Sequence, residues 1–219
     1  MKTKVLLFAL ATTVFAIGAK AQEKTTFGVR AGVNFQNVNG EDAFGKKLDN
    51  KIKTGFNIGV NAEIPLVPDF YIQPGLLFTT KGAKTETGLP NTDDIKTNVS
   101  YIEIPINLLY KPVLGSGKLL LGFGPYIGIA VGGKIKSGDK DIDIKFANDV
   151  KSNDPEIFNT MKRMDFGGNL LAGYELSSKL SFQLNAQLGM SNLETKVDGK
   201  KLDSKRKNTG FGISVGYRF

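Results

Sequence analysis

Residues 180–190 read LSFQLNAQLGM, a run in which apolar and polar side chains alternate strictly. Leu180, Phe182 and Leu184 fall on one side, whereas Ser181 and Gln183 fall on the other. Because successive side chains of an extended strand point to opposite faces, this period of two predicts a β-strand with one apolar face. A tilted strand of about 9–11 residues is also long enough to cross the hydrocarbon of a bilayer.

The same alternation recurs along the chain, and each repeat predicts another strand. Together with residues 180–190 the pattern gives eight runs, which start near these residues: Phe27, Phe56, Phe70, Ile102, Leu119, Phe166, Leu180 and Phe211. An even number of such strands can close without a free edge. The sequence therefore predicts an all-β fold, an eight-stranded antiparallel up-and-down transmembrane β-barrel.

The connections between these runs alternate in length, which is typical of a barrel with tight periplasmic turns at one end and long external loops at the other. The short connections are 67–69, 111–118 and 175–179, and the four long ones are 36–53, 80–99, 132–164 and 191–209. Pro74, Pro105 and Pro125 fall inside expected strands, where each removes a backbone donor. We expect β-bulges at these three prolines.

Alternation alone does not say which face is outside, because a soluble lipocalin-like carrier keeps its apolar face inward and a membrane barrel turns it outward. The polar face decides between them, since it is rich in Gly, Asn, Gln and Ser and poor in the Lys and Glu of a solvated surface. It carries six charges: Arg30, Glu63, Glu103, Asp165, Glu175 and Arg218. The apolar face carries none, which favours lipid contact and an enclosed polar side.

The first residues predict a cleaved export signal rather than structure. Lys2 and Lys4 precede an apolar stretch, and the small residues Ala19 and Ala21 stand where a signal peptidase cuts, leaving Gln22 as the new N-terminus. Residues 1–21 would then be a signal peptide and residues 22–219 the barrel domain. Removal takes Lys2, Lys4 and Lys20 and no acid, so the net charge falls from +8 to +5.

Three segments make the chain resemble a known family. These are Phe27-Gly28-Val29-Arg30-Ala31-Gly32, Tyr101-Ile102-Glu103-Ile104-Pro105 and the ending Gly216-Tyr217-Arg218-Phe219. In this order they look like the PorT-type outer-membrane β-barrels, or "porin family" proteins, which are similar in architecture to OmpA- and OmpX-like barrels. The resemblance implies location in the bacterial outer membrane. It also implies that Tyr217 and Phe219 form a C-terminal signal for the barrel-assembly machinery, although Phe219 can equally be one more lipid-facing residue.

Four charges of the polar face are expected to meet inside the barrel. Arg30 and Arg218 lie on the first and last strands, which are neighbours in a closed barrel, and Glu63 and Glu103 point inward from theirs. Eight strands leave a lumen that side chains can fill. We therefore expect an Arg–carboxylate cluster that neutralises the lumen and blocks a continuous pore. The alternative is a gate or a proton path.

The composition disfavours catalysis and metal binding. The chain has no His and no Cys, which removes the usual ligands of zinc and haem and the usual catalytic nucleophile–base pairs. Asp139, Asp141 and Asp143 do not begin a calcium loop, because Ile144 and Val150 stand where such a loop needs Gly and Glu. We expect no enzyme activity, no cofactor and no metal. A short strand at 142–146 and a short helix over 154–161 are expected in this loop.

Residues 191–209 form a basic loop with Asp198-Gly199 as a hairpin signal, so the strands on either side are expected to extend beyond the membrane. The loop faces lipid, including lipopolysaccharide phosphates, or is simply solvated; nucleic acid is disfavoured because the basic residues are scattered among acids. Its candidate contact residues are Lys200, Lys201, Lys205, Arg206 and Lys207.

These patterns favour a non-enzymatic envelope protein that is structural or that binds partners through its loops. The partner of the loops is not indicated by any motif. A small-solute channel and, less favoured, a soluble periplasmic carrier are the alternatives.

Overall fold

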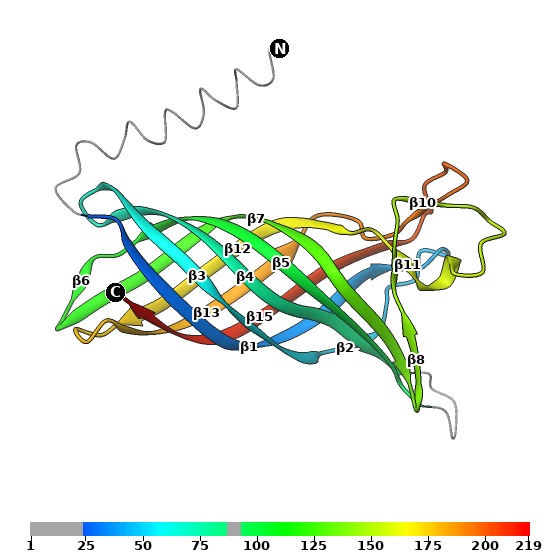
Figure 1. The fold of residues 1–219 in the computed structure, drawn as a ribbon, viewed down its shortest axis with the longest axis horizontal. Helices are drawn as coiled ribbons and strands as arrows, with labels where there is room; N and C mark the ends of the chain where they lie inside the picture. Colours follow the sequence, from blue (N-terminus) through cyan, green and yellow to red (C-terminus); the bar gives the residue numbers. More distant parts are fainter. Residues whose placement is uncertain (1–23, 87–92) are drawn as a thin grey trace, which may run out of the picture.

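The computed structural model describes residues 24–86 and 93–219, so the expected signal peptide and its cleavage residues Ala19, Ala21 and Gln22 lie outside the described residues. Eight long strands form the barrel wall, and Figure 1 shows them tilted around one common axis. Their bounds are β1 Thr26–Glu41, β3 Lys53–Val67, β4 Phe70–Thr85, β5 Ile95–Tyr110, β7 Gly117–Ser137, β12 Met164–Glu175, β13 Leu180–Gly189 and β15 Lys205–Arg218.

The barrel closes through its first and last strands. Each long strand pairs antiparallel with the next one along the chain, and β1 pairs with β15 from Gly28 opposite Arg218 to Glu41 opposite Lys205. This is the predicted eight-stranded up-and-down barrel, with all eight strands in the predicted order. Closure leaves no unpaired edge in the wall, as a lipid environment requires.

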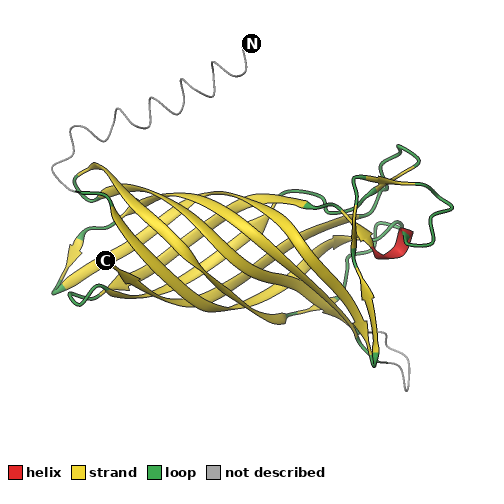
Figure 2. Ribbon diagram, viewed as in Figure 1, coloured by secondary structure: helices red, strands yellow, loops and turns green. Residues whose placement is uncertain are grey.

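The turns and loops separate to opposite ends, as predicted. Figure 2 places the short turns at one end of the barrel and the long loops at the other. Asp69, Gly115 and Lys179 adopt positive φ angles of 64°, 63° and 68°, each in one of the three short turns. The described residues contain no helix of the length and hydrophobicity that a membrane-spanning helix requires.

The apolar face of the strands points outward. Phe27 is 63% exposed and Leu184 is 60% exposed, whereas Glu103 and Ser214 on the other face are only 1% exposed. An inward apolar face, as in a lipocalin-like carrier, is therefore excluded. Tyr71, Tyr101 and Tyr126 also point inward and are buried.

The prolines do not make the expected bulges. The register is unchanged on either side of Pro74, Pro105 and Pro125, although ladder pairs are missing beside them. The register shifts lie elsewhere, near Pro65 and at Ser100. A proline removes one donor without adding a residue, so the strand keeps its phase.

The loops carry the short elements β2 Asn50–Lys51, β8 Lys140–Asp143, β9 Lys145–Phe146, β10 Asp149–Val150, β11 Thr160–Met161 and β14 Lys196–Val197, and β6 Val113–Leu114 lies in a turn. The short strand expected at 142–146 is divided between two elements: residues 142 and 143 belong to β8, which pairs with β7 as a hairpin, and residues 145 and 146 form β9. The helix expected over 154–161 is only a 3-10 turn, Ile157–Asn159.

In the last loop, the Asp198-Gly199 turn is present, but β13 ends at Gly189 and only β15 extends into the loop region. β14 instead pairs with β10 of the preceding loop.

The seam between β1 and β15 provides a test of closure. A Cβ on Gly32 would lie 2.3 Å from the backbone oxygen of Ile213, whereas a Cβ on Gly132 meets no atom within 4 Å. We predict that Gly32→Ala lowers the free energy of unfolding by roughly 1–3 kcal/mol, the usual cost of overpacking. Urea unfolding in lipid vesicles, followed by heat-modifiable migration, measures it. Gly132→Ala is the control, and equal midpoints for the two variants would contradict the tight seam.

Candidate functional site

A network of eight charged side chains lies in the lumen of the barrel. Among the described residues it contains four bases and four acids, so its formal charges cancel: Arg30, Lys81, Lys111, Arg218, Glu63, Glu103, Asp165 and Glu175. An isolated charge in so enclosed a space would pay a large desolvation cost, which a paired charge offsets. The pairs form two groups, one near the turns and one near the loops.

The turn-side cluster consists of Glu63, Lys111, Glu175 and Arg218. Lys111 Nζ lies 2.8 Å from Glu63 Oε2 and 2.8 Å from Glu175 Oε2, so one ammonium joins β3 to β12 across the lumen. Arg218 at the end of β15 donates to the other oxygen of Glu63. Both Glu63 oxygens are therefore occupied, and the cluster spans the lumen near the short turns.

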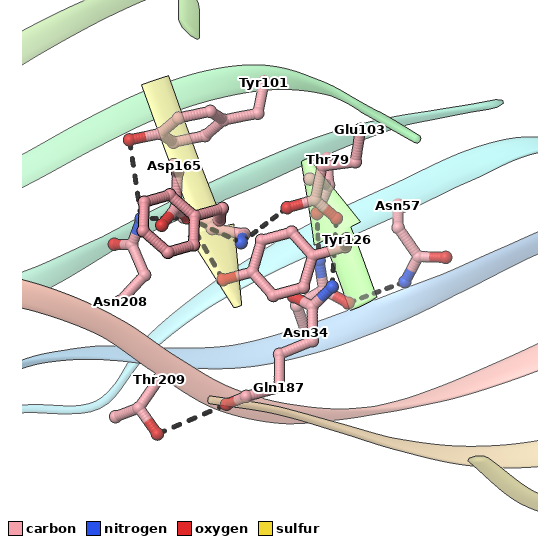
Figure 3. Close-up of polar contacts among 12 residues, drawn as sticks. Asn34, Asn57, Thr79, Tyr101, Glu103, Tyr126, Asp165, Gln187, Asn208 and Thr209 are labelled. Atoms are coloured by element: carbon pink, nitrogen blue, oxygen red, sulfur yellow. Dashed lines mark hydrogen bonds and ion pairs between the residues drawn. The ribbon is translucent and has the colours of Figure 1, made fainter. Parts of the chain in front are cut away.

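The loop-side cluster is centred on Lys81, Glu103 and Asp165. Lys81 Nζ pairs with Glu103 and lies 3.1 Å from Asp165 Oδ2, and all three side chains are at most 1% exposed. The Lys81 ammonium also lies 4.3 Å from the ring centroid of Tyr126, a cation–π contact. Figure 3 shows Tyr101, Tyr126, Glu103 and Asp165 close to one another inside the barrel.

Asp165 is the most heavily bonded acid of the network. Besides Lys81, its carboxylate accepts hydrogen bonds from Tyr126 Oη at 3.2 Å, Asn208 Nδ2 at 2.8 Å and Ser191 Oγ at 2.8 Å. Ser191 is the second residue after β13, at the start of the last loop. Asp165 therefore ties the lumen to the base of that loop.

Neutral amides fill the space between the clusters. Asn34 donates to Thr79 at 2.7 Å and accepts from Asn57 at 2.6 Å, and Asn107 donates to Gln73 at 3.2 Å. The cavity beside Arg30 and Asn34 has a volume of only about 20 Å³. A space of that size holds about one water molecule. The part of the lumen beside Arg30 and Asn34 is therefore packed.

The structure divides the expected four-residue cluster. Glu63 and Arg218 do pair, but Glu103 pairs with Lys81, and Arg30 donates to Asn185 Oδ1 at 3.2 Å instead of reaching a carboxylate. Lys81 is not among the expected lumen residues, because the alternating pattern assigns residues 80–99 to a loop. Lys111 is not among them either, because the pattern assigns residues 111–118 to a turn.

Strand parity could have identified both lysines. Lys81 continues the inward series of Gln73, Leu77 and Thr79, and Lys111 continues that of Asn107 and Leu109.

The basic loop is also divided. Lys205 and Lys207 lie on the outward face of β15, whereas Arg206 between them pairs with Glu194 at 2.7 Å. Lys200 and Lys201 come directly after the Asp198-Gly199 turn and before β15, and Lys200 forms a bridge with Val197. Strand alternation therefore separates residues that the sequence shows side by side.

The loops build a structured surface above the lumen. β9 pairs with β11 and β10 with β14, and Leu193 is buried between these segments with 1% exposure. A cavity of about 710 Å³ lies among the loops and the strand ends, and residues as far apart as Val38, Phe158 and Arg206 line it.

The acids of the third loop pair with lysines rather than with one another. Asp141 lies 3.0 Å from Lys136, and Lys145 lies 2.9 Å from Asp154 and 3.0 Å from Glu156. The hydrogen bond from Lys145 holds the pKa of Asp154 below its usual value. In the part of the chain that the structure describes, no group of three or more acids is placed to hold a metal ion.

The sequence comparison identifies the family. Residues 20–194 match the family described as "Outer membrane protein beta-barrel domain". The chain belongs to this family. The protein is thus an outer-membrane β-barrel, located in the bacterial outer membrane, with its long loops outside the cell. None of the curated proteins matches the sequence.

Solved structures of small outer-membrane barrels are similar in fold. Ail, the attachment invasion locus protein of Yersinia pestis, in complex with the heparin analogue sucrose octasulfate, is 18% identical, with 90% of this chain and 100% of that chain covered and a TM-score of 0.44. Neisserial surface protein A is 15% identical, with 90% of this chain and 100% of that chain covered and a TM-score of 0.45. OprG from Pseudomonas aeruginosa is 14% identical, with 90% of this chain and 97% of that chain covered and a TM-score of 0.41.

The loop-side cluster predicts a large effect of one substitution. Lys81→Met leaves Glu103 and Asp165 buried without their shared cation, and breaking a buried pair in this way costs about 3–5 kcal/mol. We expect a loss of that size in the free energy of unfolding, measured by urea titration in lipid vesicles. Lys84→Met removes a lysine that pairs with Asp94 near the end of β4, where both side chains are 33% exposed, and should change stability much less. Equal effects of the two substitutions would contradict the conclusion that the buried ion pairs of Lys81 stabilise the barrel.

Proposed function

We propose that this protein is a non-enzymatic outer-membrane barrel whose wall is a closed anchor and whose extracellular loops bind a partner at the cell surface. The observation that supports this most is the packed lumen, with its balanced charges and a central cavity of only about 20 Å³. The loops, in contrast, enclose about 710 Å³ at the outer end. Binding therefore belongs to the loops rather than to the lumen.

The alternative of a small-solute channel makes a different electrical prediction. Ions need a continuous aqueous path, and the two charge clusters interrupt it at both ends of the lumen. We expect purified protein in planar bilayers to give no stable conductance steps, with a porin added to the same bilayer as the positive control. Reproducible large steps from this protein alone would establish the channel and refute the closed anchor.

The non-enzymatic part of the proposal rests on the positions of the reactive groups. Ser191 donates to Asp165, but the two side chains are 7% and 0% exposed. A hydroxyl in that position has no access to substrate, and the sequence supplies no His to act as its base. The buried carboxylates serve the lumen, not acid–base chemistry.

The loop partner can be sought directly. Phe158 in the third loop is 91% exposed and next to the large loop cavity. A photo-crosslinking amino acid at position 158 should give a discrete adduct in intact cells, if the loops bind a partner. The same group at Lys179, in a periplasmic turn, is the matched control. Adducts of identical pattern from both positions, or none from 158, would count against loop binding.

We further propose that the chain is of the PorT type and that Tyr217 and Phe219 serve the barrel-assembly machinery. Support comes from the three segments of resemblance and from the placement of Phe219, whose backbone N–H donates to Phe27 at 2.8 Å and whose ring lies 5.5 Å from that of Tyr217. Phe219 thus follows β15 at the closing seam.

Two phenylalanines at this seam separate an assembly signal from simple lipid contact, because Phe27 and Phe219 are each 63% exposed. We expect Phe219→Ala to slow assembly in cells several-fold and to leave refolding into vesicles unchanged, whereas Phe27→Ala should not slow assembly. Pulse-labelling with heat-modifiable migration measures both variants. Equal delays for both would assign Phe219 to lipid contact alone.

A further inference from the structure

The outer wall at the β1–β15 seam changes character along its length. Phe35 and Phe211 stack there with ring centroids 5.2 Å apart, on the face that contacts lipid. Toward the loops, the next outward-facing pairs are Asn37 with Thr209, Asn39 with Lys207 and Glu41 with Lys205. The lipid-facing surface therefore passes directly into a polar, basic one.

A pocket of about 410 Å³ lies on this basic part of the wall. Its lining residues are Asn39, Gly40, Glu41, Lys47, Leu48, Lys205 and Lys207. Lys47 comes from a different segment, the loop after β1, and it reaches the pocket because that loop folds back onto its own strand. We call this site the seam pocket.

The loop that carries Lys47 is held by its own hydrogen bonds. Leu48 N donates to Gly40 O at 3.0 Å, and Glu41 forms an antiparallel bridge with Lys47. The Asp42 carboxylate accepts from the N–H groups of Phe44 at 2.9 Å and Lys46 at 3.0 Å. The pocket is therefore preformed, which lowers the entropic cost of binding.

The charge of the seam pocket favours an anion. Three lysines face one acid, and that acid, Glu41, is already paired with Lys205 at 3.0 Å. Across residues 24–86 and 93–219, no carboxylate lies within 4.0 Å of the Nζ atom of Lys47 or Lys207, so the two ammonium groups retain full donor capacity. Two such groups beside one pocket match a doubly charged oxyanion.

The distance of the seam pocket from the lipid-facing aromatic pair indicates what kind of ligand it meets. Lys207 lies four residues beyond Phe211 on β15. With a rise of about 3.3 Å per residue and a strand tilt of about 40°, this places the backbone of Lys207 roughly 10 Å above that of Phe211. That is the level of lipid headgroups rather than of free solution. Lysine stems can lie along the apolar wall while their charged ends reach this level.

We propose that the seam pocket binds a phosphate monoester on the headgroup of an outer-leaflet glycolipid, with Lys47 and Lys207 as the direct ligands. Lys205 completes the site and is held in place by its ion pair with Glu41. The proposal rests on the membrane anchor of the proposed function and adds a specific lipid contact to it. It assigns the lipid contact to only two of the five residues of the basic loop, together with Lys47, and excludes Lys200, Lys201 and Arg206.

The test uses the full barrel in nanodiscs that contain either bisphosphorylated lipid A or its dephosphorylated form. Native mass spectrometry measures the lipid retained by the barrel. The variant Lys47→Gln/Lys207→Gln should lower retention of the phosphorylated lipid on the order of 20-fold, since each lysine near a charged lipid surface contributes a several-fold effect. Lys200→Gln/Lys201→Gln removes the same charge elsewhere on the loops and should retain the lipid like the unsubstituted protein.

Three outcomes would overturn the proposal. Equal loss in both variants would mean diffuse surface charge, and equal retention of dephosphorylated lipid would mean that phosphate is not recognised. Complete competition by millimolar inorganic phosphate would assign the pocket to a soluble anion. Heat-modifiable migration confirms folding of every variant. Conductance recorded on the same preparations tests the closed anchor separately, so the two proposals can fail independently.

Discussion

The ion pairs of Lys81 and Lys111 are the constraint on which the rest of the structure depends. A barrel in lipid must turn its apolar face outward, and within the membrane this sends the charges of the strands into a narrow lumen. There a charge is tolerated only with a partner. Lys81 pairs with Glu103 and Asp165 on the loop side. Lys111 pairs with Glu63 and Glu175 on the turn side. Paired charges occupy the lumen, and this is why we propose the loops as the surface for binding.

The strands could be predicted from sequence because one physical rule acts on every second residue of the wall. Lipid excludes charge from the outward face, so runs such as residues 180–190 are unambiguous. The sequence also indicates which face points into the barrel. The polar face is rich in Gly, Asn and Gln, whereas a solvated surface is normally rich in Lys and Glu. Both inferences use local information only.

The pairing inside the barrel could not be predicted in the same way. Which acid meets Lys81 depends on the register between strands far apart in the sequence, and alternation does not give that register. Arg30 shows the result, because it faces the lumen as expected but bonds to Asn185 rather than to a glutamate. The loops follow the same principle, since β14 pairs with β10 of the preceding loop, and Asp198 accepts a hydrogen bond from Ser152, 46 residues earlier in the chain. Nonlocal contacts decide both.

The central claim is that the lumen holds no continuous water, and the absence of cysteine from the sequence makes a clean test possible. Ser214 on β15 points inward, is 1% exposed and accepts from Asn185 at 2.8 Å. Ser214→Cys in reconstituted barrels should resist a charged methanethiosulfonate reagent until the protein is unfolded, whereas Ser152→Cys in a loop and Ser178→Cys in a turn should react at once. Rapid modification of the folded Ser214→Cys barrel would contradict the closed lumen.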